Sequence, residues 1–267
     1  MSTEQEKVMK HEEEYSASNI QVLEGLEAVR KRPAMYIGDI GEKGLHHLVY
    51  EVVDNSIDEA LAGYCTDIYV TINEDNSISV RDNGRGIPTD WHEKEGKSAL
   101  EVVLTVLHAG GKFDHDVYKT SSGKNGVGIT ALNALSQRLQ IWSNNSKNGK
   151  WHTQVFEHGA IMSDVLQNDP PKELIKLVPK TGTILKWTPD PKIFKDGLHL
   201  DINRLEKELN DIQYLCPNIH IHMVIDDKEP EFYSEDGLAE LVAKSPNDDC
   251  IFTYSDDFTD VAVNFTK

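Results

Sequence analysis

The sequence predicts an α+β protein in which helices cover one face of a mixed, mostly antiparallel sheet. Two observations predict this class: several amphipathic stretches have helical length, and short strand-like stretches follow one another mostly as hairpins. The composition agrees with it, because the 267 residues are 39% hydrophobic and 27% charged, as in ordinary globular proteins.

The expected elements begin near residue 22. Helices are expected at 22–31, 45–63, 98–107, 126–136 and 201–214. Strands are expected at 67–73, 77–81, 138–144, 150–158, 182–188 and 219–226. Pro33 ends the first helix, since the residue before a proline disfavours helical backbone, and Gly63 suits the position after the second. The chain is expected to divide into a flexible arm, a main domain and the start of a second domain, at 1–17, 18–231 and 232–267.

The charge of the chain limits its partners. The formal net charge is −18, from 45 acidic and 27 basic side chains, so this surface on average repels nucleic acid phosphates. No run of about 18 apolar residues and no apolar leader occurs, which predicts a cytoplasmic protein. Cys65, Cys216 and Cys250 follow no ligand spacing and are expected to be reduced thiols.

The helix expected at 45–63 has two different sides. Its apolar stripe consists of Val49, Val53, Ile57 and Ala60. Glu51, Asn55 and Asp58 fall on another stripe of the same helix. Taken alone, this pattern is typical of any amphipathic surface helix.

Two glycine-bearing segments change that interpretation. In V-R-D-N-G-R-G-I-P, at 80–88, Asp82 ends a strand and two glycines permit a sharp turn. In S-S-G-K-N-G-V-G, at 121–128, glycines lead directly into a helix whose first amides could bind phosphate. Each motif alone is weak, and the Walker A and protein-kinase signatures are absent.

Together the helix and both glycine segments resemble the GHKL ATPases, and most closely their gyrase branch among the type IIA topoisomerases. The resemblance also involves V-L-E-G-L-E-A-V-R-K-R-P-A-M-Y-I-G at 22–38, E-V-V-D-N-S-I-D-E-A-L-A-G at 51–63 and L-H-A-G-G-K-F at 107–113. It implies the Bergerat fold, a two-layer sandwich, and the ATP-binding region of the gyrase-B-type component of a bacterial type II DNA topoisomerase. The corresponding component of topoisomerase IV, or a chaperone-class GHKL ATPase, are the alternatives.

The resemblance assigns roles that the chemistry supports. Glu51 would be the general base that activates water, and Asn55 would bind Mg²⁺ through its amide oxygen. Asp82 would accept a hydrogen bond from the adenine amino group, which guanine lacks at that position. Thr183, in K-T-G-T, would support the base contact through water.

Further residues complete the implied ATP site. Apolar walls would come from Val52, Ile87, Pro88 and Ile129. Gly86, in the turn after Asp82, is also expected to bind the nucleotide. Gly110, Gly111 and Lys112 would belong to a lid, the amides of Gly126, Val127 and Gly128 would cradle phosphates, and Tyr118 would reach the nucleoside side. Asp58, Glu59 and Arg85 are expected to form a salt-bridged frame, and His46, His47 and His108 to be structural or solvated.

The implied partners are ATP with Mg²⁺, a second copy of the chain, and a gyrase A-type subunit and DNA in the whole enzyme. Tyr15 and Ile20 match the arm through which the family dimerises when nucleotide binds. ATP-competitive gyrase inhibitors are also implied ligands. Three positions, Ser122, Lys124 and Asn125, depart from the usual lid, and 142–150 lacks the family's arginine. Slow hydrolysis is expected, because the family's γ-phosphate lysine lies beyond residue 267.

Overall fold

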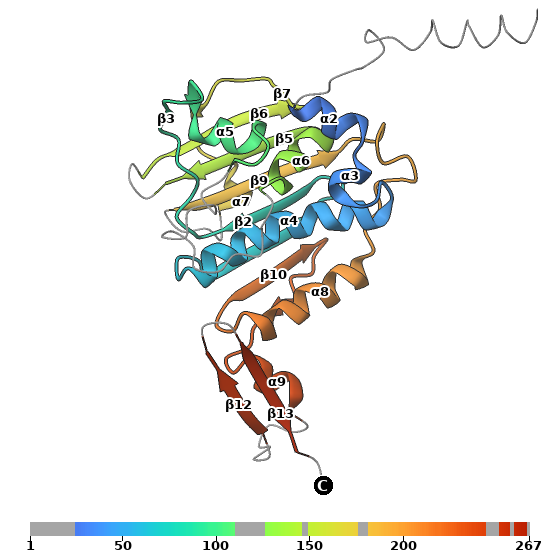
Figure 1. Cartoon of the computed structure of the whole chain (residues 1–267), viewed down its shortest axis with the longest axis vertical. Helices are drawn as coiled ribbons and strands as arrows, with labels where there is room; N and C mark the ends of the chain where they lie inside the picture. Colours follow the sequence, from blue (N-terminus) through green and yellow to red (C-terminus); the bar gives the residue numbers. More distant parts are fainter. Residues whose placement is uncertain are drawn as a thin grey trace, which may run out of the picture.

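The computed structural model describes residues 25–109, 126–145, 149–175, 181–243, 251–256 and 259–265. It has two main layers, a nine-stranded sheet and a layer of helices on one of its faces (Figure 1). This confirms the expected α+β class. Within these residues, no helix has both the length and the apolar character needed to cross a membrane.

The sheet has the strand order β11-β10-β1-β2-β9-β5-β6-β7, with β8 also paired to β6. Its strands are β1 Asp67–Ile72, β2 Ile78–Asp82, β5 Ser136–Asn144, β6 Trp151–Glu157, β7 Ala160–Ile161, β8 Leu166–Gln167, β9 Gly182–Pro189, β10 His220–Ile225 and β11 Glu231–Phe232. Every pairing is antiparallel except that of β1 with β10. All six expected strands are present, and the two-residue strands β7, β8 and β11 were not expected.

The helices also lie close to their expected positions. They are α2 Gly25–Lys31, α3 Ala34–Ile37, α4 Glu42–Leu61, α5 Ala99–Thr105, α6 Gly128–Leu135, α7 Lys172–Ile175, α8 Ile202–Leu215 and α9 Leu238–Val242. Ser98 caps α5 by accepting from the Glu101 amide, and Asp201 caps α8 by accepting from the Arg204 amide. Gly63, with φ +81°, ends the α4 segment as expected.

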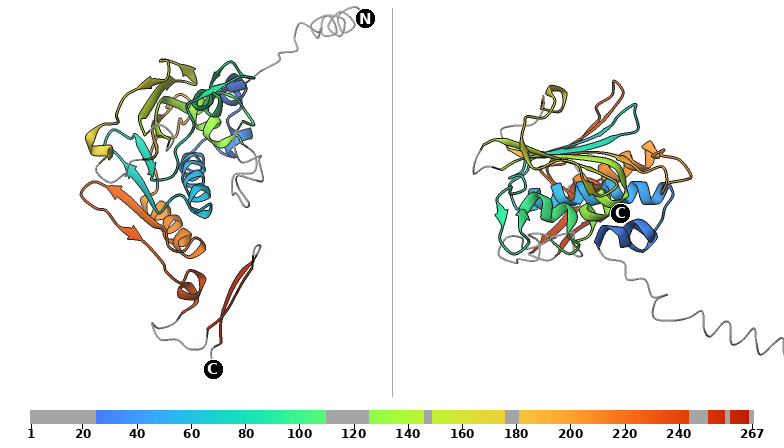
Figure 2. Two further views of the ribbon diagram at one scale, coloured as in Figure 1. Left: turned by 90° about the vertical axis from the view of Figure 1, so that its left-hand side faces the viewer. Right: turned by 90° about the horizontal axis from the view of Figure 1, so that it is seen from above.

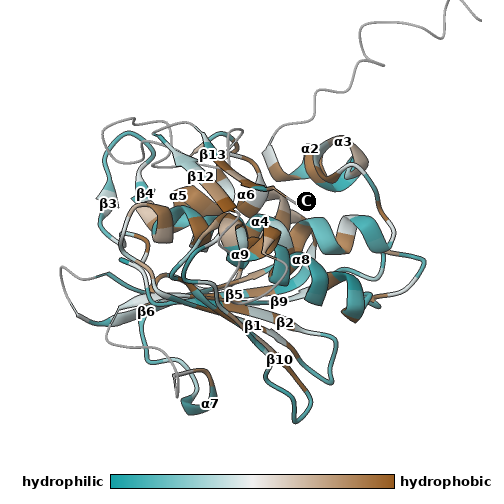
Figure 3. Cartoon of the chain, turned by 90° about the horizontal axis from the view of Figure 1, so that it is seen from below, coloured by the Kyte–Doolittle hydropathy of each residue, from teal (hydrophilic) through white to brown (hydrophobic). Residues whose placement is uncertain are grey.

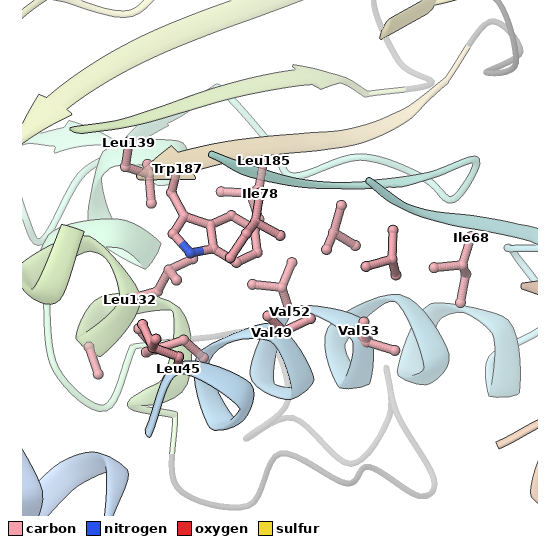
Figure 4. Packing of buried hydrophobic residues seen from close by; sticks show 14 of the residues in the cluster. Leu45, Val49, Val52, Val53, Ile68, Ile78, Leu132, Leu139, Leu185 and Trp187 are labelled. Atoms are coloured by element: carbon pink, nitrogen blue, oxygen red, sulfur yellow. The ribbon is translucent and has the colours of Figure 1, made fainter. Parts of the chain in front are cut away.

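The core lies between α4, α6 and the inner face of the sheet. Val49 and Val53 of α4 are fully buried there, as the apolar stripe predicted. Figure 4 shows them beneath Leu185 and Trp187 of β9, with Leu132 of α6 alongside. This packing fixes the rotation of α4, and therefore the direction in which its polar stripe points.

The inner face changes from apolar to polar at one end of the sheet. Val80, Leu185 and Ile141 lie side by side across β2, β9 and β5 and belong to the core. Two residues along these strands, the same face carries a row that we call the site row, formed by Asp82, Thr183 and Ser143. Because side chains alternate along a strand, this row also faces the helix layer.

The outer face carries a small cluster of its own. Trp142, Trp151 and Ile184 are buried against Leu174 of α7. Arg81 donates to the Leu174 carbonyl at 3.0 Å. Figure 3 shows α7 on the side of the sheet opposite the other helices. α7 is a single helical turn and was not among the expected helices.

The last described segments form a separate group (Figure 2). After α9, β12 Ile251–Ser255 pairs with β13 Asp260–Asn264 in a sheet of two strands. Another two-stranded sheet joins β3 Trp91–His92 to β4 Lys97–Ser98. β11, at Glu231–Phe232, still belongs to the large sheet. The expected start of a second domain at residue 232 stays a prediction.

Candidate functional site

One side of α4 carries a polar ladder made of Glu51, Asn55 and Glu59, spaced four residues apart. Its two ends contact different glycine-bearing segments. The Glu51 carboxylate lies against Gly128 at the start of α6, and the Glu59 carboxylate lies beside Gly84 in the loop after β2. The half-buried Asn55 lies between them, one helical turn from each. The helix therefore joins the two motifs that the sequence singled out.

Glu51 and α6 are in direct contact. A Cβ atom added to Gly128 would overlap the Glu51 Oε2 atom, so this approach requires glycine. α6 begins at Gly128 after Val127, and no described side chain caps its first turn. Thr130 and Asn133 anchor the same helix to the end of α5 by donating to the Val103 and Leu104 carbonyls. A carboxylate thus stands beside a fixed helix start.

The other Glu51 oxygen contacts a histidine on the same helix. His47 Nε2 lies 3.2 Å from Glu51 Oε1, one turn earlier on α4. It was expected to be structural or solvated, and its side chain is 41% exposed while it contacts the carboxylate of the central residue of the site. The spacing of four residues on one helix was the available signal.

Asp82 is the buried carboxylate at the other side of the site. Its Oδ1 accepts from the Gly84 amide at 2.9 Å and the Thr183 amide at 3.3 Å. Its Oδ2 accepts from the Ser56 hydroxyl of α4 at 3.2 Å. Burial raises the pKa of Asp82 to about 6, although these donors act in the opposite direction. Ser56 was another residue that the sequence analysis did not single out.

Thr183 is held beside Asp82 by the sheet itself, since the two are register partners in β2 and β9. The preceding residue, Gly182, has φ +141°, and a Cβ atom there would overlap the Asp82 carbonyl oxygen. The glycine of K-T-G-T therefore allows β9 to approach the end of β2 closely.

The loop after β2 continues along the end of β5. Ile87 donates from its amide to the Ser143 hydroxyl, and the same hydroxyl donates to the Ile87 carbonyl, both at 2.8 Å. Ile87 and Ile129 are half-buried against the main core, and Val52 is buried in it. Pro88 is exposed. The expected apolar residues thus come from α4, α6 and this loop.

Glu59 and Arg85 form the expected salt-bridged frame. Arg85 donates from Nη2 to Glu59 Oε1 at 2.7 Å and from Nε to Glu59 Oε2 at 3.0 Å. Its guanidinium also lies 3.8 Å from the ring centre of Tyr64. Asp58 is fully buried. Burial raises the pKa of Cys216 to about 11, and the nearby charges of Asp54 and Asp58 act in the same direction. It therefore lies on the side of α4 that faces α8.

The ends of the segment between α5 and α6 meet beside this site. The His108 amide donates to the Gly126 carbonyl at 3.0 Å. Gly126, Val127 and Gly128 all lie at the start of α6. Several expected site and arm residues fall outside the described residues: Tyr15, Ile20, Gly110, Gly111, Lys112, Tyr118, Ser122, Lys124 and Asn125.

The site offers few side-chain ligands to a metal ion. Within the described residues, no group of three or more His, Cys, Asp or Glu side chains is arranged to hold a metal ion. The ladder offers the amide oxygen of Asn55 and the carboxylate of Glu51. Such oxygen ligands suit Mg²⁺ only when water and phosphate complete its shell. Asn55 and Glu51 therefore fit Mg²⁺ that is bound together with a phosphate group.

Comparison with known proteins agrees with this geometry. Residues 40–159 match the family model described as "Histidine kinase-, DNA gyrase B-, and HSP90-like ATPase". The chain contains a GHKL ATPase domain. The matched residues include α4, the loop after β2 and the start of α6, while Thr183 on β9 lies beyond them.

The similarity to particular proteins extends over most of the chain. It is 50% identical over 242 residues to the DNA gyrase B protein of Synechocystis sp., covering 88% of this chain and 21% of that protein. Identity to the DNA gyrase B protein of Thermotoga maritima is 50% over 232 residues, which cover 86% of this chain and 35% of that protein. For the Borreliella burgdorferi protein, identity is 49% over 259 residues, which cover 94% of this chain and 39% of that protein. The chain thus spans well under half the length of these relatives.

Proposed function

We propose that this chain binds ATP, with the base at Asp82 and the phosphates between Glu51 and the start of α6. The observation that carries the proposal is the position of Asp82, a buried carboxylate at the end of a strand in the site row. Three donors fix its two oxygens, and the carboxylate keeps acceptor capacity for the adenine amino group. The guanine carbonyl oxygen would face these oxygens with repulsion instead.

The phosphates are proposed to bind at the first turn of α6. The partial positive charge of a helix start and its uncapped amides favour an anion there. Gly128 brings this turn within contact of Glu51 because it has no side chain. Asn55, on the ladder between base and phosphates, is the proposed Mg²⁺ ligand. Magnesium bound there would neutralise charge on the phosphates.

The proposed reaction is hydrolysis of the γ-phosphate. A water oxygen forms a bond to the γ-phosphorus, the bond to the bridging oxygen breaks, and ADP leaves. Glu51 takes the proton from that water, and His47 is a positioning residue that holds the carboxylate through the 3.2 Å contact. Pro88, Ile87, Val52 and Ile129 are proposed as the apolar contacts of the nucleoside, with Thr183 supporting the base.

In the whole protein, we propose, this chain is the ATPase region of the gyrase-B-type component of a bacterial type II DNA topoisomerase. The support is the identity to DNA gyrase B proteins over most of this chain. ATP binding would join two copies through the arm at 1–17, and the segment from 232 would lead into a second domain. DNA and the gyrase A-type subunit would bind elsewhere, in keeping with the net charge of −18.

The decisive test separates binding from hydrolysis. Calorimetry with a non-hydrolysable ATP analogue and Mg²⁺ measures binding, and phosphate release under single-turnover conditions measures the reaction. The Glu51→Gln variant should bind the analogue within about threefold of the wild type and lose phosphate release by about 100-fold or more. Phosphate release that persists in this variant would refute the role of Glu51. No binding by the wild-type chain would refute the proposed function.

A further inference from the structure

One serine ties the loop after β2 to the sheet. The Ser143 hydroxyl both accepts from the Ile87 amide and donates to the Ile87 carbonyl, each at 2.8 Å. Ser143 is fully buried, and its own main chain is already paired with β6 and β9. The hydroxyl therefore satisfies both main-chain groups of Ile87, much as a neighbouring strand would.

Two further contacts hold the same loop against the end of β5. The Asn145 side-chain amide donates to the Gly86 carbonyl at 3.3 Å. Gly86 has φ +72°, and a Cβ atom there would lie 2.6 Å from the Asn144 carbonyl oxygen. The main chain of the loop thus lies directly on that of β5, with no side chain between them.

The position of Ser143 connects this tether to the base site. Ser143, Thr183 and Asp82 are consecutive members of the site row, on β5, β9 and β2. The rigid sheet sets the spacing between Asp82 and Ser143, and the hydroxyl sets the spacing between Ser143 and Ile87. The Ser143 hydroxyl therefore helps to set the distance from the acceptor of the base to the apolar residue beside it, together with the contacts at Gly86.

We propose that Ser143 is a positioning residue for nucleotide binding, and that its hydroxyl holds Ile87 against the ring of the bound base. This inference rests on the proposed function. Without the hydroxyl, the Ile87 amide and carbonyl lose their partners, and the loop gains freedom that binding must remove. The loss concerns the base and not the phosphates, because the loop that Ser143 holds carries the contact to the base.

The test uses the Ser143→Ala variant with two ligands, adenosine and a non-hydrolysable ATP analogue with Mg²⁺. Calorimetry should show both ligands weakened by the same factor, about 5- to 20-fold, because they share the base. Ser143→Thr, which retains a hydroxyl, should recover most of the affinity. A variant that merely unfolded in part would lower the binding stoichiometry and leave Kd unchanged.

Ser79 provides the matched control. It is a fully buried serine on β2 of the same sheet, and within the described residues its hydroxyl has no hydrogen-bond partner. Ser79→Ala should bind both ligands like the wild type. Asn145→Ala, which removes the tether to Gly86, should weaken both ligands in the same direction and serves if Ser143→Ala does not fold.

The outcomes distinguish this inference from the proposed function. Equal affinities of Ser143→Ala and Ser79→Ala would overturn the role of Ser143 and leave ATP binding intact. Should Ser143→Ala not fold, unchanged affinity in Asn145→Ala overturns it instead. A wild-type chain that binds neither ligand overturns both proposals together.

Discussion

The Glu51 carboxylate lies against the α-carbon of Gly128, so the central acid of α4 and the first residue of α6 are in contact. The α4 side chain reaches the helix start only because position 128 has no Cβ atom, and α6 stays there because Thr130 and Asn133 anchor it to α5. This contact places a carboxylate where the anion of a substrate would bind.

Substituting Gly128 with alanine tests that contact. The added methyl group would displace the Glu51 carboxylate, and we expect the protein to lose about 0.5–1.5 kcal/mol of stability, because this part-exposed side chain must leave its rotamer. Thermal or urea unfolding measures the loss. The Gly128→Ala/Glu51→Ala double variant should recover part of it, because the displaced carboxylate is gone. Losses that simply add in the double variant would show that the two side chains do not interact.

His47 should act on the rate and not on binding. In His47→Ala the Glu51 carboxylate loses its 3.2 Å partner, while the α4 main chain that carries it is unchanged. We expect kcat for ATP hydrolysis to fall about 10-fold, with KM changed less than about threefold. His92→Ala, in the exposed β3–β4 hairpin, is the control and should match the wild type. An unchanged kcat in His47→Ala would remove this residue from the proposed mechanism.

Asp82 should make folding stability depend on pH. Its pKa is raised from 3.8 to about 6 in the folded chain, so the folded state holds this proton more tightly than the unfolded state. The Asp82 contribution to stability is fully present below pH 3.8 and is lost as the pH rises through about 6. At about 1.4 kcal/mol per pH unit, the difference approaches 3 kcal/mol.

Urea unfolding at pH 4 to 8 measures this dependence. Asp82→Asn removes the titrating group, so its stability relative to the wild type should rise as the pH increases across that range. A difference between the two proteins that stays constant with pH would contradict the raised pKa.

The same group predicts proton release when nucleotide binds. The adenine amino group donates to the ionised form of Asp82, and binding should therefore lower its pKa and release a proton near pH 6. Calorimetry of adenosine binding in buffers of different ionisation enthalpy counts that proton, and adenosine avoids titration of phosphate groups. Asp82→Asn should release none. Equal proton counts in the two proteins would place the titrating group elsewhere.

Much of the fold follows from local patterns in the sequence. The apolar stripe of α4 fixed which side of the helix faces the sheet, and the strand alternation placed Asp82 and Thr183 on its inner face. α7 could not be predicted, because one helical turn carries no periodic signal and forms only against Trp142 and Trp151 on the outer face.

The site was predictable in its motifs but not in its supporting contacts. Glu51, Asp82 and the glycines stand in recognisable segments. Ser143 lies 56 residues from Ile87, and Ser56 lies 26 residues from Asp82. Such bonds depend on which distant strands pair and in which register, and local patterns in the sequence do not determine this pairing. The contact between His47 and Glu51 is the opposite case, because the spacing of four residues on one helix is visible in the sequence.

The choice between adenine and guanine nucleotides tests the central claim most directly. Calorimetry with ATP and GTP analogues, in the presence of Mg²⁺, should show the wild-type chain binding the adenine analogue at least about 100-fold more tightly. Asp82→Asn should lose most of that preference, because an amide can also donate to the guanine oxygen. A wild-type chain that binds both analogues equally, or an Asp82→Asn variant with the full preference for adenine, would contradict the assignment of the base site.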